Sequence, residues 1–291
     1  MKTKRNALTR IIVFSVLIIV LLSILLLGIR KGSFPIPVLH LGSSGQYENA
    51  NEYKSGDASL TADRLDQLEI NWVDGKVSVS PYEGKTIEIK ENASGNLSDR
   101  EQLHYYFKEG KLIIQYRESG LFSWGGNNKN KNLTVQIPTA LCQNLSEVSI
   151  DATSCDVDVT GLSGKNFDFD TVSGNIQATD VDCTQKFNLD TVSGEFKFTG
   201  KIQELDVDTT SGECNVSSDI TPNKIDFDGV SGGLVLQIPA SSQFTLDFDS
   251  VSGDFNNNFS TVQNGDTYTC GNGSAQYDVE SVSGDVEIRK K

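Results

Sequence analysis

A repeat of about 20 residues dominates the second half of the chain and constrains its fold more than any other feature. Six copies alternate apolar and acidic residues and then reach Ser-Gly, and a degenerate seventh copy precedes them. Their serines are spaced by 19, 20, 18, 20, 21 and 31 residues, and residues 256–274 form an insertion in the last interval. The copies are VSIDATSCDV (148–157, degenerate), FDFDTVSGNI (167–176), FNLDTVSGEF (187–196), LDVDTTSGEC (205–214), IDFDGVSGGL (225–234), LDFDSVSGDF (246–255) and YDVESVSGDV (277–286).

The residues within one copy predict a β-strand, because alternating side chains point to opposite faces. Phe167 and Phe169 point one way and Asp168 and Asp170 the other, and Val172 adds a further apolar side chain after Thr171. One copy cannot bury its own apolar row, but stacked copies can. We therefore expect an all-β protein, a parallel β-solenoid over residues 60–291, with rungs of about 20 residues and the short repeats at 148–286. Glycines would form the turns, at Gly174, Gly194, Gly212, Gly232, Gly253 and Gly284.

Five further segments before the repeats are β-branched, aromatic or alternating, which predicts strands there as well. The dipeptide at 109–110 predicts a hairpin turn between two of them. Residues 121–132 predict a loop whose Trp124 either serves as an exposed binding aromatic or folds back onto the domain. The predicted strands are 76–80, 85–90, 103–108, 111–117 and 133–137.

Residues 11–29 form an uncharged, apolar run long enough for one transmembrane helix. A cleaved secretory signal is the alternative, but the run is longer than such signals and is followed by Arg30 and Lys31 without a small-residue cleavage pattern. More basic residues precede the run than follow it, so the orientation rule places residues 1–10 in the cytoplasm. Residues 30–59 would then be a polar tether, and residues 60–291 would lie outside the cell membrane.

Two columns of acidic side chains would face outward from the stack. The segment after residue 31 carries all 39 acidic residues and 19 of the 25 basic ones, which argues against nucleic acid as a partner. The columns could cap turns, keep a solvated face, bind divalent cations weakly or dock a cationic envelope component. The candidate cation ligands are Asp168, Asp206, Asp226 and Asp247. The first column also holds Asn188 and Asp278, and the second holds Asp170, Asp190, Asp208, Asp228, Asp249 and Glu280.

Catalysis has little support in these residues. The chain has two histidines, His40 and His104, and neither lies in the repeats to activate the repeated serines. We expect the serines to bond to one another and to the backbone. Acids that recur on every rung do not mark one active site, so we predict a non-enzyme without a cofactor, with a polysaccharide-acting enzyme as the alternative. The cysteines lack metal-ligand spacing and are expected to pack in the core, at Cys142, Cys155, Cys183, Cys214 and Cys270.

An apolar span followed by repeated D-x-V-S-G units resembles the bacterial domain of unknown function, named an adhesin from its architecture, that occurs in LiaG-type proteins. The resemblance extends from about residue 65 to the end and carries over no catalytic residues. It implies a membrane-anchored, non-catalytic interaction module of the cell envelope, linked to envelope stress. Its partners would be an envelope polymer or a membrane protein, and an accessory regulator that binds partners through its span is a further alternative.

Overall fold

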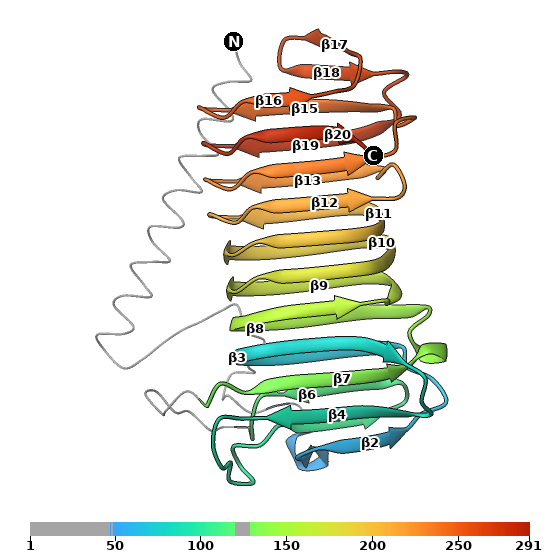
Figure 1. The fold of residues 1–291 in the computed structure, drawn as a ribbon, viewed down its shortest axis with the longest axis vertical. Helices are drawn as coiled ribbons and strands as arrows, with labels where there is room; N and C mark the ends of the chain where they lie inside the picture. Colours follow the sequence, from blue (N-terminus) through green and yellow to red (C-terminus); the bar gives the residue numbers. More distant parts are fainter. Residues whose placement is uncertain (1–46, 48, 120–128) are drawn as a thin grey trace, which may run out of the picture. The chain divides into compact units, whose positions relative to one another are not determined.

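The computed structural model describes residues 47, 49–119 and 129–291, which fold into a stack of twenty β-strands with two short 3₁₀ helices (Figure 1). This part of the chain is all-β, as the sequence predicts. The expected cytoplasmic tail, the span at 11–29, the start of the tether and Trp124 lie outside the described residues. Within the described ranges, no helix has the length and apolar character that crossing a membrane requires.

Each rung has two straight sides joined by the Ser-Gly turn, here called the A side and the B side. The A side contains residues 167–171 of the first intact repeat, and the B side contains residues 176–179 of the same rung. Neighbouring rungs pair in parallel and in register on both sides. In spatial order the A side runs through β6 (Lys111–Gln115), β3 (Gln67–Tyr82), β8 (Leu145–Thr160), β9 (Ser163–Ser173), β10 (Ile176–Ser193), β11 (Phe196–Thr209), β13 (Lys224–Gly229), β19 (Ala275–Ser281) and β15 (Phe244–Ser250).

Several long strands pass around the turn and also contribute to the B side. Its spatial order is β7 (Asn132–Pro138), β3, β8, β10, β11, β12 (Cys214–Ser218), β14 (Leu234–Ile238), β20 (Val286–Lys290) and β16 (Phe255–Asn257).

The rungs at both ends are stacked out of sequence order. The last rung, β19–β20, lies between β13–β14 and β15–β16, although the chain reaches β15–β16 first (Figure 1). The Lys291 N–H donates to the Ile238 carbonyl oxygen at 2.8 Å, so the end of the chain is hydrogen-bonded to the preceding rung. At the other end, β3 likewise lies between β6–β7 and β8. The intercalated rungs bury their apolar side chains from both directions.

Antiparallel strands cover both ends, so the parallel β-solenoid predicted over residues 60–291 does not extend through them, and the hairpin predicted at 109–110 is part of one of these caps. At the start, β4 (Thr86–Asn92) pairs with β7 and β2 (Ala58–Thr61) pairs with β4, while β5 (His104–Lys108) pairs with β6 and β1 (Lys54–Ser55) pairs with β5. At the far end, β18 (Thr267–Cys270) pairs with β15 and β17 (Thr261–Asn264) pairs with β18. Hairpins can occupy an end because they satisfy a row of backbone groups without needing another rung.

The folded region begins earlier than the predicted tether boundary, because η1 (Ala50–Glu52), β1 and β2 begin before residue 60. Backbone pairing with β4 and β5 fixes this polar segment, which its composition alone did not indicate. The five strands predicted before the repeats are confirmed, as is the hairpin at Glu109–Gly110, where both residues have positive φ. The remaining short helix, η2 (Thr139–Leu141), links β7 to β8.

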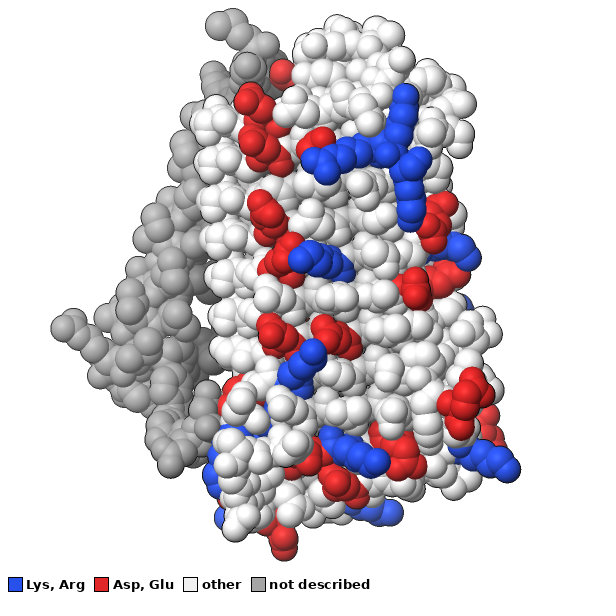
Figure 2. Space-filling view, viewed as in Figure 1, with Lys and Arg blue, Asp and Glu red and all other residues white. Residues whose placement is uncertain are grey.

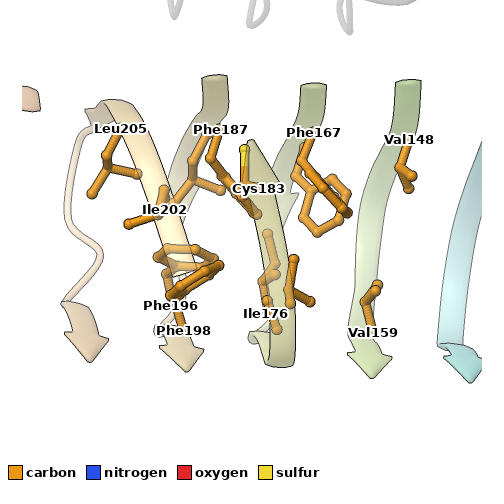
Figure 3. Close-up of a cluster of buried hydrophobic side chains, with 14 of the residues drawn as sticks. Val148, Val159, Phe167, Ile176, Cys183, Phe187, Phe196, Phe198, Ile202 and Leu205 are labelled. Carbon is orange, nitrogen blue, oxygen red and sulfur yellow. The ribbon is translucent and has the colours of Figure 1, made fainter. Parts of the chain in front are cut away.

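The core lies between the A and B sides (Figure 3). The Phe167 and Phe187 rings stack at 5.6 Å between centroids, and the Phe169 ring meets Phe187 edge-on at 5.1 Å. Phe167 and Phe169 are buried, as the alternation predicts. All five cysteines are buried and free, which confirms that they pack in the core.

The turn glycines are required chiefly because stacked backbones approach closely. Of the six, only Gly174 and Gly194 have a positive φ, at 131° and 137°. A Cβ at any of the six would come within 2.5 Å of the carbonyl oxygen of the neighbouring rung. At Gly232 this distance to the Gly212 oxygen would be 1.9 Å. A side chain there would force two rungs apart.

Replacing Gly232 with alanine should therefore destabilise the fold by about 1–3 kcal/mol, the usual cost of overpacking a close contact. Gly95 is the matched control, because a Cβ there would meet nothing within 4 Å. Gly95→Ala should change the free energy of unfolding by less than about 0.5 kcal/mol. Denaturant unfolding of both variants measures the difference, and equal effects would contradict the close-approach explanation.

Candidate interaction surface

The repeats place seven carboxyl groups in one uninterrupted column on the outer surface of the A side. Strand register aligns each acid with its equivalent on the next rung. Rungs in a parallel sheet lie about 4.8 Å apart, so the column is a closely spaced line of like charges. We call it the inner acid column, and in spatial order it holds Asp151, Asp170, Asp190, Asp208, Asp228, Glu280 and Asp249.

Five of these carboxyl groups, from Asp151 to Asp228 along the column, hold protons more tightly than ordinary aspartates. Burial, reinforced by the neighbouring carboxyl groups, raises the pKa of Asp170, Asp190 and Asp208 to about 6 and that of Asp228 to about 7. Carboxyl groups on adjacent rungs also shift one another's pKa, as Asp151 and Asp190 do for Asp170 and as Asp190 does for Asp208. The column is therefore a partly protonated ladder near neutral pH.

The candidate cation ligands lie in the other column of acids, which we call the outer acid column. Its members stand two residues before those of the inner acid column in each rung. Asn188 interrupts the acids and donates a hydrogen bond from its Nδ2 to Asp168 Oδ1 at 2.9 Å. Asp206 and Asp226 are already paired with lysines, at 2.5 Å from Lys186 Nζ and 3.0 Å from Lys224 Nζ. The column runs Asp168, Asn188, Asp206, Asp226, Asp278 and Asp247 in spatial order.

The four predicted cation ligands share this column, but it does not gather them into one coordination shell. Among the residues that the structure describes, no group of three or more His, Cys, Asp or Glu side chains is arranged to hold a metal ion. Cation binding by Asp168, Asp206, Asp226 and Asp247 stays a prediction.

Exposed valines line the other flank of the inner acid column. The alternation continues through the end of each A-side strand, so Thr171 is buried and Val172 points outward. The exposed fractions of Val172, Val192 and Val251 are 53%, 49% and 58%, unusually high for branched apolar side chains. The valine column is, in spatial order, Thr153, Val172, Val192, Thr210, Val230, Val282 and Val251. Sequence reasoning missed it, although strict period-two counting from Phe167 would have placed Val172 outside.

The repeated serines serve the turn, as the sequence predicts. Ser211 Oγ donates to the Val192 carbonyl oxygen at 3.1 Å, and Ser154 Oγ lies 3.2 Å from Ser173 Oγ. The same bond to the adjacent rung recurs at Ser193, Ser231, Ser252 and Ser283.

Turn capping, one of the roles that the sequence suggested for the acid columns, is seen at residues outside them. Asp156 Oδ1 accepts the Asn175 N–H at 2.9 Å, and Thr209 Oγ1 accepts the Gly212 N–H at 2.9 Å. Asp285 Oδ1 accepts the Asp254 N–H at 2.9 Å in the same way as Asp156.

Figure 2 shows acidic side chains recurring along one margin of the face it presents, beside broad areas without charge.

Two shallow hollows lie on other parts of the surface. One, of about 370 Å³, lies over B-side strands and contains Lys197, Arg289 and a single acid, Glu195. The other, of about 390 Å³, contains mostly amide side chains and a single acid, Glu204. Glycoside hydrolysis ordinarily uses two carboxyl groups that face each other across the substrate. Neither hollow offers such a pair.

A family model of the Toastrack DUF4097 domain matches residues 59–289, which include most of both end caps, the intercalated rungs and all seven repeats. The chain belongs to the Toastrack DUF4097 family. This membership agrees with the resemblance that the repeated Ser-Gly segments indicated. A search of curated proteins found no match.

Solved structures with a similar course of the chain include three bacterial proteins of low sequence identity. A proposed cell adhesion protein from Clostridium sporogenes is 14% identical, with 82% of this chain and 100% of that chain covered and a TM-score of 0.43. A proposed adhesin from Bacteroides fragilis is 14% identical, with 81% of this chain and 96% of that chain covered and a TM-score of 0.45. A proposed lipid-binding protein from Parabacteroides distasonis is 16% identical, with 82% of this chain and 97% of that chain covered and a TM-score of 0.46.

The proton affinity of the inner acid column predicts a dependence of stability on pH. In the unfolded chain these aspartates regain the ordinary pKa of 3.8, so between about pH 4 and pH 7 the folded state binds more protons. Stability should therefore rise as the pH falls from 7.5 to 5, by on the order of 2 kcal/mol after allowance for solvent screening. Urea unfolding at several pH values measures this slope.

The double variant Asp190→Asn with Asp208→Asn should flatten the slope, because it removes two of the shifted groups. A stability that decreased as the pH fell from 7.5 to 5 would contradict the raised pKa values of the column.

Proposed function

We propose that this Toastrack chain is a non-catalytic interaction module of the bacterial cell envelope, and that its A side docks a cationic, partly apolar envelope component. The observation that carries the proposal is the placement of seven carboxyl groups in register directly beside the valine column, in which Val172, Val192 and Val251 are exposed. Turns alone do not require such a surface, because the caps and the serine bonds come from other positions.

Electrostatics supports a cationic partner. Like charges at rung spacing repel one another, and an approaching cation relieves that repulsion along the whole column. Because the ladder is partly protonated near neutral pH, a bound cation would also displace protons from it. The valines add apolar contact area, which favours a ligand that alternates charge and apolar groups over a simple ion.

The proposal includes an anchor formed by residues 11–29, with residues 1–10 in the cytoplasm and the Toastrack domain outside. The uncharged run and its flanking basic residues support this arrangement. Alkaline phosphatase fused after Lys291 should then be active, because that enzyme requires export, and an inactive fusion would contradict the arrangement. The resemblance to LiaG-type proteins extends the proposal to envelope stress.

A polysaccharide-acting enzyme is the less favoured alternative. The single acids in the two hollows, Glu195 and Glu204, do not provide the paired carboxyl groups of such an enzyme. The acids that do come together belong to the ladder, where each rung repeats the same arrangement.

The docking proposal predicts preferential binding of a synthetic peptide of alternating lysine and leucine over one of alternating glutamate and leucine. Fluorescence anisotropy of labelled peptides measures the affinity, which should fall as NaCl is added because the contacts are exposed. The variant Asp190→Asn with Asp208→Asn should weaken lysine-peptide binding about tenfold, a loss of about 1.4 kcal/mol.

A matched control removes two charges from the B side, through Asp158→Asn with Glu287→Gln. This control has the same net charge as the A-side variant and should bind the lysine peptide with unchanged affinity. Equal weakening by the two double variants would show that total charge, and not the A-side columns, governs binding.

A further inference from the structure

A lysine and two carboxyl groups are buried together at the N-terminal end of the stack, away from the acid columns. Lys131 immediately precedes β7, and Glu91 lies near the end of the antiparallel neighbour β4, where it is paired with Leu133. Asp74 comes from β3, the rung stacked on β7. We call these three residues, with Trp72 and Tyr116, the buried lysine cluster. The sequence gives no signal of it, because Lys131 follows a polar Asn- and Lys-rich stretch.

The charged side chains of this cluster are almost completely excluded from water. The side chains of Lys131 and Glu91 are 2% and 5% exposed, and Asp74 is 4% exposed. Lys131 Nζ lies 4.0 Å from the centre of the Tyr116 ring and 5.3 Å from that of Trp72. Burial lowers the pKa of Lys131, against the opposing effects of Glu91 and Asp74. Desolvation of this kind favours the neutral, nucleophilic amine.

The contacts of Lys131 Nζ leave its lone pair directed at Glu91. The nitrogen donates to the Glu101 carbonyl oxygen at 2.6 Å and to the Tyr116 carbonyl oxygen. Its third neighbour is Glu91 Oε1, at 2.6 Å, and this oxygen has no partner with hydrogen-bond geometry. A neutral amine has two N–H bonds and one lone pair, so two carbonyl acceptors leave the lone pair for the third neighbour.

The carboxyl group of Glu91 is held in an orientation that suits attack by the Lys131 amine. Its second oxygen, Oε2, accepts the backbone N–H of Leu103 at 3.1 Å. A fixed donor at that position stabilises negative charge that develops on the oxygen when a nucleophile adds to the carboxyl carbon. The second buried acid, Asp74, accepts the Tyr116 hydroxyl on Oδ1 at 2.6 Å, while its Oδ2 is buried without a partner.

We propose that Lys131 and Glu91 form an intramolecular isopeptide bond between Nζ and Cδ, a covalent link between the residue preceding β7 and strand β4. The observations behind it are the 2.6 Å contact, the exclusion of water and the two carbonyl oxygens that hold the nitrogen. Exclusion of water also favours the amide at equilibrium, because water is the other product of its formation.

The reaction balances without an oxidant, a cofactor or a co-reactant. A proton passes from the Lys131 ammonium to Glu91 Oε1 across their contact, which leaves an amine and a carboxylic acid. The Nζ lone pair then adds to Cδ, and negative charge on Oε2 is stabilised by the Leu103 N–H. A proton passes from Nζ to the Oε1 hydroxyl across their 2.6 Å contact, and this oxygen leaves as water. One N–C bond forms, one C–O bond breaks, and the chain loses one molecule of water.

The bond would fasten the end cap that precedes the repeats. Residues 91 and 131 enclose β5 and β6, so the link would close this whole segment into a covalent loop. The antiparallel strands of the cap lack the continuous stacking that supports central rungs. A covalent link between β4 and the start of β7 would hold this cap under mechanical load, which suits a module that contacts an envelope component.

Intact mass spectrometry of the purified full-length chain under denaturing conditions tests the proposal directly. The expected mass is lower than the mass calculated from the sequence by one water, about 18 Da. Trypsin should then release residues 91–100 joined to residues 130–165, since a modified Lys131 is no longer cleaved. An unmodified mass would overturn the proposal, as would a water loss that maps to any other pair of residues.

Variants separate this bond from other causes of water loss. Lys131→Met and Glu91→Ala should each keep the full mass calculated for their sequence. Lys129 and Glu101 provide the matched control, because this neighbouring ion pair at 3.3 Å is exposed to water. Lys129→Met should still lose one water, and the wild-type mass remains decisive if any variant fails to fold.

Discussion

The close approach of stacked backbones at the Ser-Gly turn is the contact on which the rest of the structure depends. At six turns a carbonyl oxygen of the neighbouring rung occupies the space that a side chain would need, so glycine recurs there, whereas the degenerate copy has Cys155 at this position. This contact holds consecutive rungs in one register. Register in turn decides which side chains face the core, because a slip of one residue would exchange the two faces.

Fixed register turns a one-dimensional repeat into surface columns with distinct physical properties. Each of these rungs contributes an apolar row to the core, an acid to a partly protonated ladder and a valine or threonine to the column beside it. A line of charged acids destabilises the fold by mutual repulsion, and partial protonation near neutral pH lowers that repulsion. The same ladder can respond to a cationic ligand because its charge is not fixed. Structure and proposed function therefore depend on the same alignment.

The repeat pattern predicted much of this arrangement. The period, the inward phenylalanines, the buried cysteines and the hydrogen-bonded serines follow from alternation and stacking within one copy. The outward direction of Val172 also follows from that alternation, yet its apolar character suggested the core. The antiparallel caps were less predictable, since β2 and β4 are placed by pairing with distant partners and not by a local pattern.

Two features could not be predicted from the sequence at all. The first is the order of the rungs, because copies with almost the same residues fit the same neighbours equally well in register. Only the connection through residues 258–274, which folds back with the β17–β18 hairpin, decides that β19–β20 is enclosed. The second is the burial of Lys131 between rings and carboxyl groups, which depends on contacts among β3, β4 and β7 that lie far apart in sequence.

Cysteine cross-linking along the valine column tests the rung order most directly. Positions 230 and 282 lie on adjacent rungs, about 5 Å apart, whereas 230 and 251 are separated by the intercalated rung, about 10 Å apart. A disulfide spans only the shorter distance. The five native cysteines are buried and should not compete. Val230→Cys should form a disulfide with Val282→Cys and not with Val251→Cys, and the reverse result would show that the rungs stack in sequence order.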